Sequence, residues 1–326
     1  MRFGPVPVAD ALGAILAHAV PAGATLLRKG KLLDPADIAA LQGAGVRQVT
    51  VAMLDPGDLD ENAAAAKLAR ALVGTHVTVS AAATGRVNLF AQVAGILSLD
   101  AAAIGRFNAV NPMITLATLP PYSRLAAGNM IATIKIIAYA VPEADVDRAA
   151  DMAATLDVLP PVYHRATLIE THLGEPQPIK GRTALAKRLA RFDIALDDRC
   201  TVSHEINALA AALDAASGEV IFILTASATS DSADVGPAAL RAAGGTLGQF
   251  GMPVDPGNLL FLGDLRGRPV IGLPGCARSP ALNGADWVLE RVVCGRVPTP
   301  ADIAAMGVGG LLKEIPDRPQ PRRQIG

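Results

Sequence analysis

The sequence has few cysteines, and these follow no disulfide or metal-binding pattern. Cys200, Cys276 and Cys294 are the three cysteines of the 326-residue chain. Their number is odd, they are widely spaced, and no two form a CxxC pair, so the sequence indicates neither a disulfide framework nor a zinc cluster. We therefore expect a reducing compartment, the cytoplasm.

Charged residues are also scarce, at 18% of the chain, and the 29 Lys+Arg nearly balance the 30 Asp+Glu. Proteins that bind nucleic acid need clustered basic surface to release counterions from the phosphates. The short basic groups of this chain are mostly offset by nearby aspartates, so we expect no nucleic-acid partner. With 51% hydrophobic residues and a mean hydropathy of +0.36, the chain is too apolar to be disordered.

Long apolar runs are missing as well, since no stretch approaches 18 uninterrupted apolar residues. Near the N-terminus, Pro5, Pro7 and Asp10 interrupt what could otherwise be the apolar core of a signal peptide. We expect no membrane partner and a cytoplasmic location.

The length of the chain predicts two globular domains. Its 31 glycines and 24 prolines fall between periodic segments, where turns are expected. Pro160-Pro161 marks the expected boundary between the domains. We predict an N-terminal α/β region over residues 1–160, an α/β/α domain over residues 161–310, and a C-terminal tail over residues 311–326.

Elements of the first half are predicted from periodicity and capping signals. Asp34 followed by Pro35 reads as a helix start, and a strand is expected at Arg47–Met53. The apolar spacing of Val8–Ala19 also predicts a helix. Further helices are expected at 58–73, 100–110 and 143–156, and strands at 75–80, 86–93 and 128–141.

The second half alternates strands with helices, which predicts a mostly parallel sheet covered on both faces, a three-layer α/β/α arrangement. The segment Val220–Leu224 is apolar at every position and is expected at the centre of the sheet. Asp264–Gly267 is expected to be a hairpin turn that makes the sheet mixed at one side. The predicted strands are 166–170, 199–202, 219–224, 259–262 and 269–273, and the predicted helices are 183–192, 205–216, 235–243 and 279–293.

Ligands of open parallel sheets bind beyond the carboxyl ends of the strands, and two segments there carry candidate residues. The segment Thr225–Asp234 contains many small hydroxyl residues and leads into a predicted helix near Val235. Hydroxyls, backbone N–H groups and a helix N-terminus suit an anion, most simply a phosphate. The alternative is that this segment only caps the helix.

The segment Gly272–Pro280 follows the last predicted strand. Gly275 would let the backbone approach a ligand, Arg278 offers a planar fork to a phosphate or carboxylate, and Ser279 with Pro280 would start the next helix. The alternative is a tight turn between strand and helix. Because both segments follow strands of one sheet, we expect them to face each other across one crevice.

Other patterns are weak. The sequence has no GxGxxG after a strand, no GxxxxGK[ST] and no HExxH, so it does not indicate dinucleotide, P-loop or zinc-peptidase chemistry. Cys276 could be a thiolate at a helix start, but a small tolerated residue is the simpler interpretation. Asp197-Asp198 and His204-Glu205 could bind Mg²⁺, or could be solvated helix starts.

The residues at these two segments resemble a known family. Ile223–Ser230, followed by Asp234, resembles the T-x-G-G-T-G…D loop of the molybdopterin-binding domains in molybdopterin adenylyltransferases and molybdenum insertases. Gly272–Gly275 is similar to the second loop of that family, G-L-P-G-N-P. Phe250–Leu260 and Pro274–Pro280 resemble the molybdopterin-binding proteins that are sometimes fused to a nucleotidyltransferase domain. Residues 30–51 also resemble the insertases.

The resemblance covers most of residues 165–310 and implies a molybdopterin-binding domain. It implies that an acidic residue at Asp234 assists metal or phosphate chemistry, with Mg²⁺ as a candidate cofactor, and that the chain forms a homo-oligomer. A molybdenum cofactor nucleotidyltransferase or a molybdoenzyme is the implied protein partner. The implied molybdopterin contacts are Thr225, Ser227, Thr229, Ser230, Gly275, Cys276, Arg278 and Ser279.

This chain departs from the family pattern in four places, one of which is the acidic pair expected after the second strand, present only loosely as His204-Glu205. Ser227-Ala228 stands where the family has paired glycines, Asp255 stands near the position of an insertase lysine, and Cys276 replaces an asparagine. The first hypothesis is a molybdopterin-binding protein of cofactor biosynthesis or handling, with or without nucleotidyl transfer or metal insertion. The second is a non-catalytic carrier for a nucleotidyltransferase or a molybdoenzyme, which the departures favour. The third is a nucleotide pyrophosphate hydrolase on the same fold.

Overall fold

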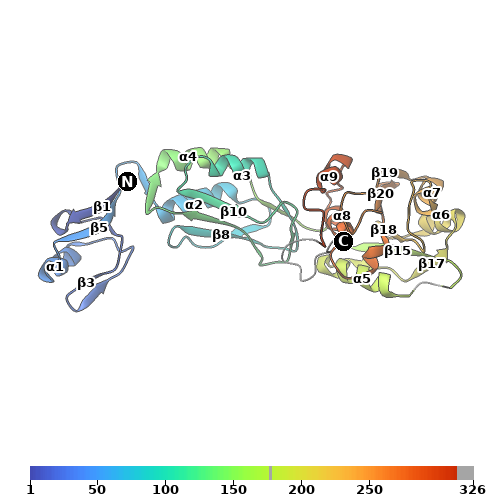
Figure 1. The fold of residues 1–326 in the computed structure, drawn as a ribbon, viewed down its shortest axis with the longest axis horizontal. Helices are drawn as coiled ribbons and strands as arrows, with labels where there is room; N and C mark the ends of the chain where they lie inside the picture. The colour runs from blue at the N-terminus through green and yellow to red at the C-terminus, as the bar shows by residue number, and fades with distance from the viewer. Residues whose placement is uncertain (176–177, 314–326) are drawn as a thin grey trace, which may run out of the picture. The chain divides into compact units, whose positions relative to one another are not determined.

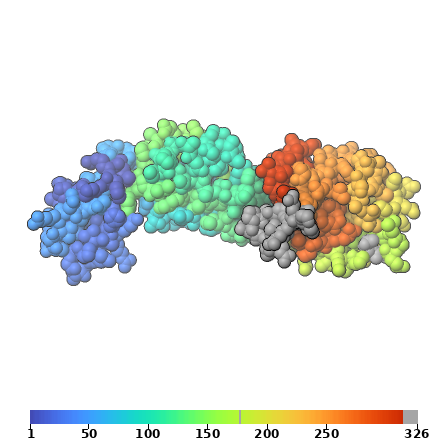
Figure 2. All heavy atoms as spheres, viewed as in Figure 1, coloured from blue at the N-terminus to red at the C-terminus, as the bar shows by residue number. Residues whose placement is uncertain are grey.

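A computed structural model describes residues 1–175 and 178–313. The chain forms two compact units, shown as ribbons in Figure 1 and as spheres in Figure 2. Of the described residues, unit 1 comprises 1–93 and 97–158, and unit 2 comprises 94–96, 159–175 and 178–313. A domain is a part of the chain that folds on its own, so the predicted domain boundaries stay a prediction. Of the predicted tail, residues 314–326 lie outside the described part of the chain.

Unit 1 begins with an antiparallel sheet in the order β1-β5-β2. The predicted helix is confirmed as α1 (Pro35–Gly43). The side chain of Asp34 caps it by accepting a hydrogen bond from the backbone N–H of Asp37 at 2.9 Å, as the sequence predicted. The predicted strand at residues 47–53 is confirmed as β5. The strands are β1 (Arg2–Pro7), β2 (Ile15–Leu16), β3 (Val20–Ala22), β4 (Thr25–Leu27) and β5 (Gln48–Met53).

The helix expected at Val8–Ala19 is wrong. Only η1 (Val8–Asp10), a 3₁₀ turn, forms there. Gly13 then adopts φ +74°, and the chain continues as β2, which pairs with β5. The apolar side chains of this segment therefore belong in part to a strand that pairs with β5, which is distant in the sequence.

The rest of unit 1 is built on an antiparallel sheet in the order β10-β12-β8-β7. Helices α2 and α3 pack against this sheet, and α4 packs against both helices (Figure 1). The helices are α2 (Glu61–Leu72), α3 (Ala101–Asn108) and α4 (Glu143–Met152), and the strands are β6 (Asp58–Asp60), β7 (Val77–Val79), β8 (Arg86–Ala91), β10 (Ile114–Thr118), β12 (Met130–Ile136) and β13 (Ala140–Pro142). A further sheet joins β9 (Gly95–Ser98), β11 (Arg124–Leu125) and β14 (Asp157–Leu159).

Unit 2 contains a seven-stranded mixed sheet in the order β16-β15-β18-β21-β20-β19, with β17 also paired to β15. The strands β15, β16, β17, β18 and β21 pair in parallel, whereas β19, β20 and β21 pair antiparallel. These strands are β15 (Arg165–His172), β16 (Ala195–Leu196), β17 (Cys200–Ser203), β18 (Val220–Leu224), β19 (Thr246–Phe250), β20 (Phe261–Leu265) and β21 (Arg268–Gly272).

Two sequence predictions about this sheet are confirmed. Every residue of β18 is buried, as expected for a central strand. The predicted hairpin turn connects β20 to β21, with Arg266 and Gly267 at positive φ. The edge strand β19 was not predicted.

Helices α6 and α7 pack together and share a core with Ile169, Ile223 and Phe261 of the sheet. Leu224 points to the other face of the sheet, because side chains alternate along a strand, and there it contacts Gly181 of α5. The helices are α5 (Lys180–Leu189), α6 (Ile206–Ala215), α7 (Val235–Ala242), α8 (Gly284–Val293) and α9 (Pro300–Ala305), with 3₁₀ turns η2 (Ala190–Phe192) and η3 (Gly275–Arg278). No helix in the described ranges is long and apolar enough to cross a membrane.

Candidate functional site

Two loops follow neighbouring parallel strands of unit 2. The first loop, residues 225–234, follows β18, and the second loop, residues 273–283, follows β21. The two strands are in register near their carboxyl ends, where Ile223 pairs with Gly272. The loops therefore begin side by side at the edge of the sheet where ligands of such folds bind.

The first loop folds around two buried hydroxyls. Thr225 and Thr229 are 6% and 5% exposed, and their hydroxyl oxygens are 3.2 Å apart. The Thr225 hydroxyl also donates to the carbonyl of Ser227 at 2.7 Å. Ser227 and Ser230 are exposed, so they are the hydroxyls of the predicted set that solvent can reach.

The backbone of the first loop does not require the family's paired glycines. None of the described residues with positive φ lies within residues 225–234. Ser227 and Ala228 therefore fit this loop without backbone strain.

Asp234 caps helix α7. Its Oδ1 accepts the N–H of Val235 at 2.7 Å, and its Oδ2 accepts the N–H of Ser230 at 3.1 Å. Both carboxylate oxygens are thus used in fixing the loop to the helix. The capping role that the sequence left open is present, and the catalytic role of Asp234 stays a prediction.

Arg278 links the two loops. Its Nη2 donates to the carbonyl oxygen of Thr225 at 2.7 Å. Burial lowers the pKa of Arg278, and the negative charge of Glu170 acts in the opposite direction. Thr225 and Arg278, two members of the predicted site, are therefore brought together as expected. The contact between them involves the backbone carbonyl of Thr225 and not its hydroxyl.

Arg188 of α5 holds the second loop in place through hydrogen bonds to its backbone. The sequence analysis did not identify this residue as part of the site. The guanidinium of Arg188 is buried and donates to the carbonyls of Ala277 (2.9 Å), Ser279 (2.9 Å) and Ala281 (3.2 Å). The predicted ligand contacts Gly275 and Ser279 are exposed on this loop. An arginine in the middle of a predicted helix gave no signal of this function.

Cys276 is half-buried in the second loop. Burial raises the pKa of its thiol, Lys313 and Arg188 act to lower it, and Asp255 acts to raise it. A thiol with a raised pKa stays protonated at neutral pH and is a poor nucleophile. The negative charge of Asp255 therefore acts on the second loop, and the positive charges of Lys313 and Arg188 act in the opposite direction.

The start of the first loop is anchored by a residue that the sequence analysis did not single out. Thr171 of β15 is fully buried, and its hydroxyl accepts the N–H of Ala226 at 2.8 Å. The same hydroxyl lies 2.9 Å from Nδ1 of His204. A hydroxyl directly after the predicted strand 166–170 was the available signal.

Glu170, the preceding residue, is a second charged group missed by the sequence analysis. Its side chain is buried, with the residue only 1% exposed, and its Oε2 accepts a hydrogen bond from Nε of Arg199 at 2.9 Å. Its Oε1 has no hydrogen-bond partner among the described residues.

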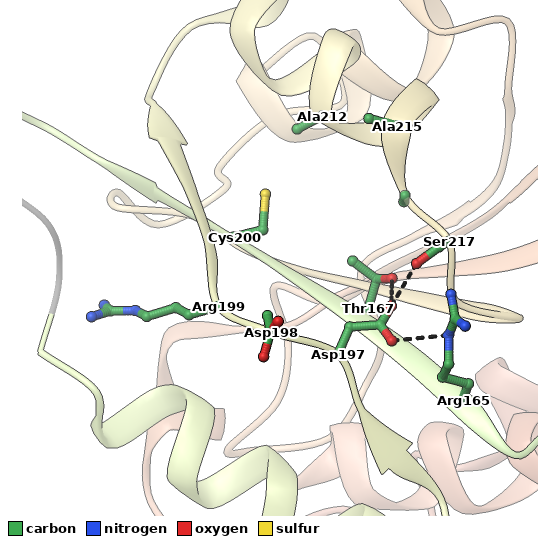
Figure 3. Close-up of a pocket in the computed structure, with 10 residues that line it drawn as sticks. Arg165, Thr167, Asp197, Asp198, Arg199, Cys200, Ala212, Ala215 and Ser217 are labelled. Carbon is green, nitrogen blue, oxygen red and sulfur yellow. Dashed lines mark hydrogen bonds and ion pairs between the residues drawn. The ribbon is translucent and has the colours of Figure 1, made fainter.

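A polar cavity of about 440 Å³ surrounds the Asp197-Asp198 pair, away from the two loops (Figure 3). The carboxylate of Asp197 accepts hydrogen bonds from Thr167 at 2.5 Å and Ser217 at 3.0 Å, and pairs with Arg165 at 2.9 Å. These contacts engage the carboxylate of Asp197, and the binding of Mg²⁺ at this pair stays a prediction. Across the described ranges, no cluster of three or more His, Cys, Asp or Glu residues could hold a metal.

Residues 5–53 match a family model described as a domain of unknown function, DUF8806. No curated protein is significantly similar to the sequence.

Several solved structures resemble this chain at low sequence identity. One is a molybdopterin biosynthesis MoeA protein from Pyrococcus horikosii, with 15% identity and a TM-score of 0.33, in which the match covers 91% of this chain and 75% of the other. Another is a molybdenum cofactor biosynthesis protein from Pyrococcus furiosus, with 13% identity, a TM-score of 0.26, and coverage of 91% and 66%. Such low TM-scores do not establish a shared fold, so the interpretation below rests on the residues of this chain.

Proposed function

We propose that this protein binds the phosphate group of molybdopterin between its first and second loops and acts in molybdenum cofactor biosynthesis or handling. The observation that carries the proposal is the hydrogen bond from Arg278 to the carbonyl of Thr225. It joins the two loops whose residues resemble the molybdopterin-binding family. We also propose that residues 161–310 form a three-layer α/β/α domain, which carries these loops.

The chemistry of the loops suits a phosphate. Nη2 of Arg278 is held by Thr225, and no hydrogen bond of its Nε or Nη1 is found within the described residues. These two donors can form the charge-assisted pair that a phosphate prefers. The exposed hydroxyls of Ser227 and Ser279 add a further donor on each of the two loops, whereas that of Ser230 donates to the carbonyl of Ala228 at 3.3 Å.

The proposal is tested by anaerobic titration of the purified protein with molybdopterin, followed by pterin fluorescence. Parallel samples contain Mg²⁺ with ATP or CTP, and turnover is measured by the appearance of a nucleotide-linked pterin. Saturable micromolar binding supports the proposal. Absence of binding by the folded protein would overturn it.

A second candidate function is a non-catalytic carrier that passes molybdopterin to a nucleotidyltransferase or a molybdoenzyme. The specific observation in its favour is that one carboxylate oxygen of Asp234 caps helix α7 and the other accepts the N–H of Ser230 in the first loop. A carboxylate engaged in this way holds structure and is poorly placed to act on a substrate. Binding without turnover in the titration favours the carrier, and release of phosphate from a panel of nucleotides would instead indicate a pyrophosphate hydrolase.

A further inference from the structure

Glu170 carries a buried acceptor that the protein itself does not use. The side chain is at the carboxyl end of β15, and Arg199 fixes Oε2 through a 2.9 Å hydrogen bond. Oε1 is buried and has no partner in the described residues. Leaving a buried acceptor unpaired is costly, so such an atom in a folded protein calls for an explanation.

Glu170 and Arg278 meet at the first turn of α5. A Cβ atom placed on Gly181 would lie 3.7 Å from Oε1 of Glu170 and 3.4 Å from Cγ of Arg278. The unpaired oxygen is therefore close to the side chain that links the two loops. The proposed phosphate site thus has an unused carboxylate oxygen near the side chain of Arg278, and the charge of Glu170 acts on the Arg278 guanidinium.

A carboxylate can only accept a hydrogen bond, so it repels a fully ionised anion but binds one that carries a proton. We propose that Oε1 of Glu170 accepts the O–H of a singly protonated phosphate monoester while Arg278 binds the ionised oxygens of the same group. This inference rests on the proposed function, and it makes Glu170 a residue that determines which anions bind.

The inference defines the substrate class. A phosphate monoester has a second pKa of about 6 and carries a proton below it. A sulfate monoester and a phosphate within a nucleotide linkage have no such proton in this pH range, so they leave Oε1 unpaired and facing negative charge. The site should therefore prefer free molybdopterin, a monoester, over its nucleotide-linked form.

Several charged or titratable groups surround Glu170. Arg199 precedes β17, Arg278 lies in η3, and His172 is on the same face of β15 two residues further on. The elements β18 and α5 contribute the uncharged residues Leu224 and Gly181 at this place. The binding of a sulfate monoester at different pH values reports the titration of the protein groups, because the ligand itself does not titrate.

The test uses phenyl phosphate and phenyl sulfate, which differ in the presence of this proton. Their affinities for the full chain are measured by calorimetry at pH 5.5 and pH 8. We expect phenyl phosphate to bind roughly tenfold or more tightly than phenyl sulfate at pH 5.5, since a hydrogen bond to a charged group has about that effect, and we expect the ratio to fall at pH 8.

The variant Glu170→Gln gives the decisive comparison. Because Arg199 donates to one position of the side chain, the amide oxygen should occupy that position, and the NH₂ should occupy the position of Oε1. The variant then offers a donor, so its preference for phenyl phosphate at pH 5.5 should disappear. Glu143→Gln, at an exposed position of unit 1, is the control and should keep the preference.

The outcomes separate this inference from the proposed function. If phenyl phosphate and molybdopterin bind but the phosphate-to-sulfate ratio is near one, or is unchanged in Glu170→Gln, the role of Glu170 is wrong and the binding function stands. If neither molybdopterin nor either probe binds, the proposed site itself is wrong. The pH profile of the unmodified protein tests the inference without any variant.

Discussion

Arg188 and Asp286 form a buried ion pair that joins α5 to α8. Nε of Arg188 lies 2.6 Å from Oδ1 of Asp286, and each side chain is 5% exposed. The same guanidinium holds three carbonyls of the second loop. Helix packing and loop position therefore depend on one side chain.

Replacement of Arg188 by Met should strongly destabilise unit 2. The change leaves the carboxylate of Asp286 buried without its partner, which typically costs about 3–5 kcal/mol. Urea unfolding followed by circular dichroism measures the loss. Arg266→Met removes an exposed pair with Asp214 and should cost less than about 1 kcal/mol. Equal losses in the two variants would contradict the structural role of Arg188.

Replacement of Arg278 by Gln should weaken molybdopterin binding by roughly tenfold or more, because a hydrogen bond to a charged group contributes about 1.5–3 kcal/mol. Arg278→Lys keeps the positive charge but cannot hold Thr225 and a phosphate together, so we expect it to recover only part of the affinity. Pterin fluorescence titration gives both values. Arg148→Gln, an exposed change in unit 1, should bind like the unmodified protein. Full affinity in Arg278→Gln would remove the second loop from the site.

Asp234 is predicted to act mainly as a helix cap. Asp234→Ala should lower the free energy of unfolding by about 1 kcal/mol, whereas Asp234→Asn should lower it less, since asparagine keeps one cap acceptor and loses only the bond from the N–H of Ser230. Urea unfolding distinguishes the two variants. If turnover is found, Asp234→Asn should also be assayed, because loss of turnover with intact binding would show that the charge is catalytic.

Elements with local signals could be predicted from the sequence, and elements that depend on distant pairing could not. Asp34 and Pro35 identified the start of α1 from neighbouring residues alone. The Val8–Ala19 segment has helical spacing, yet Ile15 pairs with Ala52 of β5. Strand β19 is likewise defined by its pairing with β20.

The same distinction applies to the candidate site. The hydroxyl and glycine content identified the two loops, and the link from Arg278 to the first loop agrees with their expected proximity. Arg188 and Asp286 are 98 positions apart, and no local pattern connects them. Glu170 was a single acidic residue in a predicted strand, and its importance comes from the atoms that surround it.

Gly272 should not tolerate a side chain. A Cβ atom at this position would lie 1.9 Å from Cε1 of the buried Phe261. We expect Gly272→Ala to cost about 1–3 kcal/mol through forced repacking. Gly105, exposed in α3, has no atom within 4 Å of its Cβ position, so Gly105→Ala should stabilise the protein by about 0.5–1 kcal/mol. Thermal unfolding gives the sign of each effect, and destabilisation by both changes would refute the contrast.

Cys294 should make the stability of the protein sensitive to alkaline pH. Burial, followed by the nearby charge of Glu290, raises the pKa of this thiol from 9.0 to about 12. Folding therefore favours the neutral thiol, and this contribution is full below pH 9 and is lost as the pH rises toward 12, by about 1.4 kcal/mol per pH unit.

The pH effect can be isolated with Cys294→Ala. Between pH 8 and pH 10.5, the unmodified protein should lose about 2 kcal/mol more stability than the variant. Urea unfolding at the two pH values measures this difference, and other alkaline transitions cancel in the comparison. Parallel losses in the two proteins would show that the thiol does not titrate as expected.

The bonds that hold the second loop have a consequence for affinity. Arg188 donates hydrogen bonds to carbonyl groups of the second loop, and Arg278 joins this loop to the first loop. Because these bonds form when the chain folds, most of the loop's conformational entropy is lost at folding and not at ligand binding. A small phosphate group can then be bound tightly through a few contacts, since it does not have to order the loops that receive it.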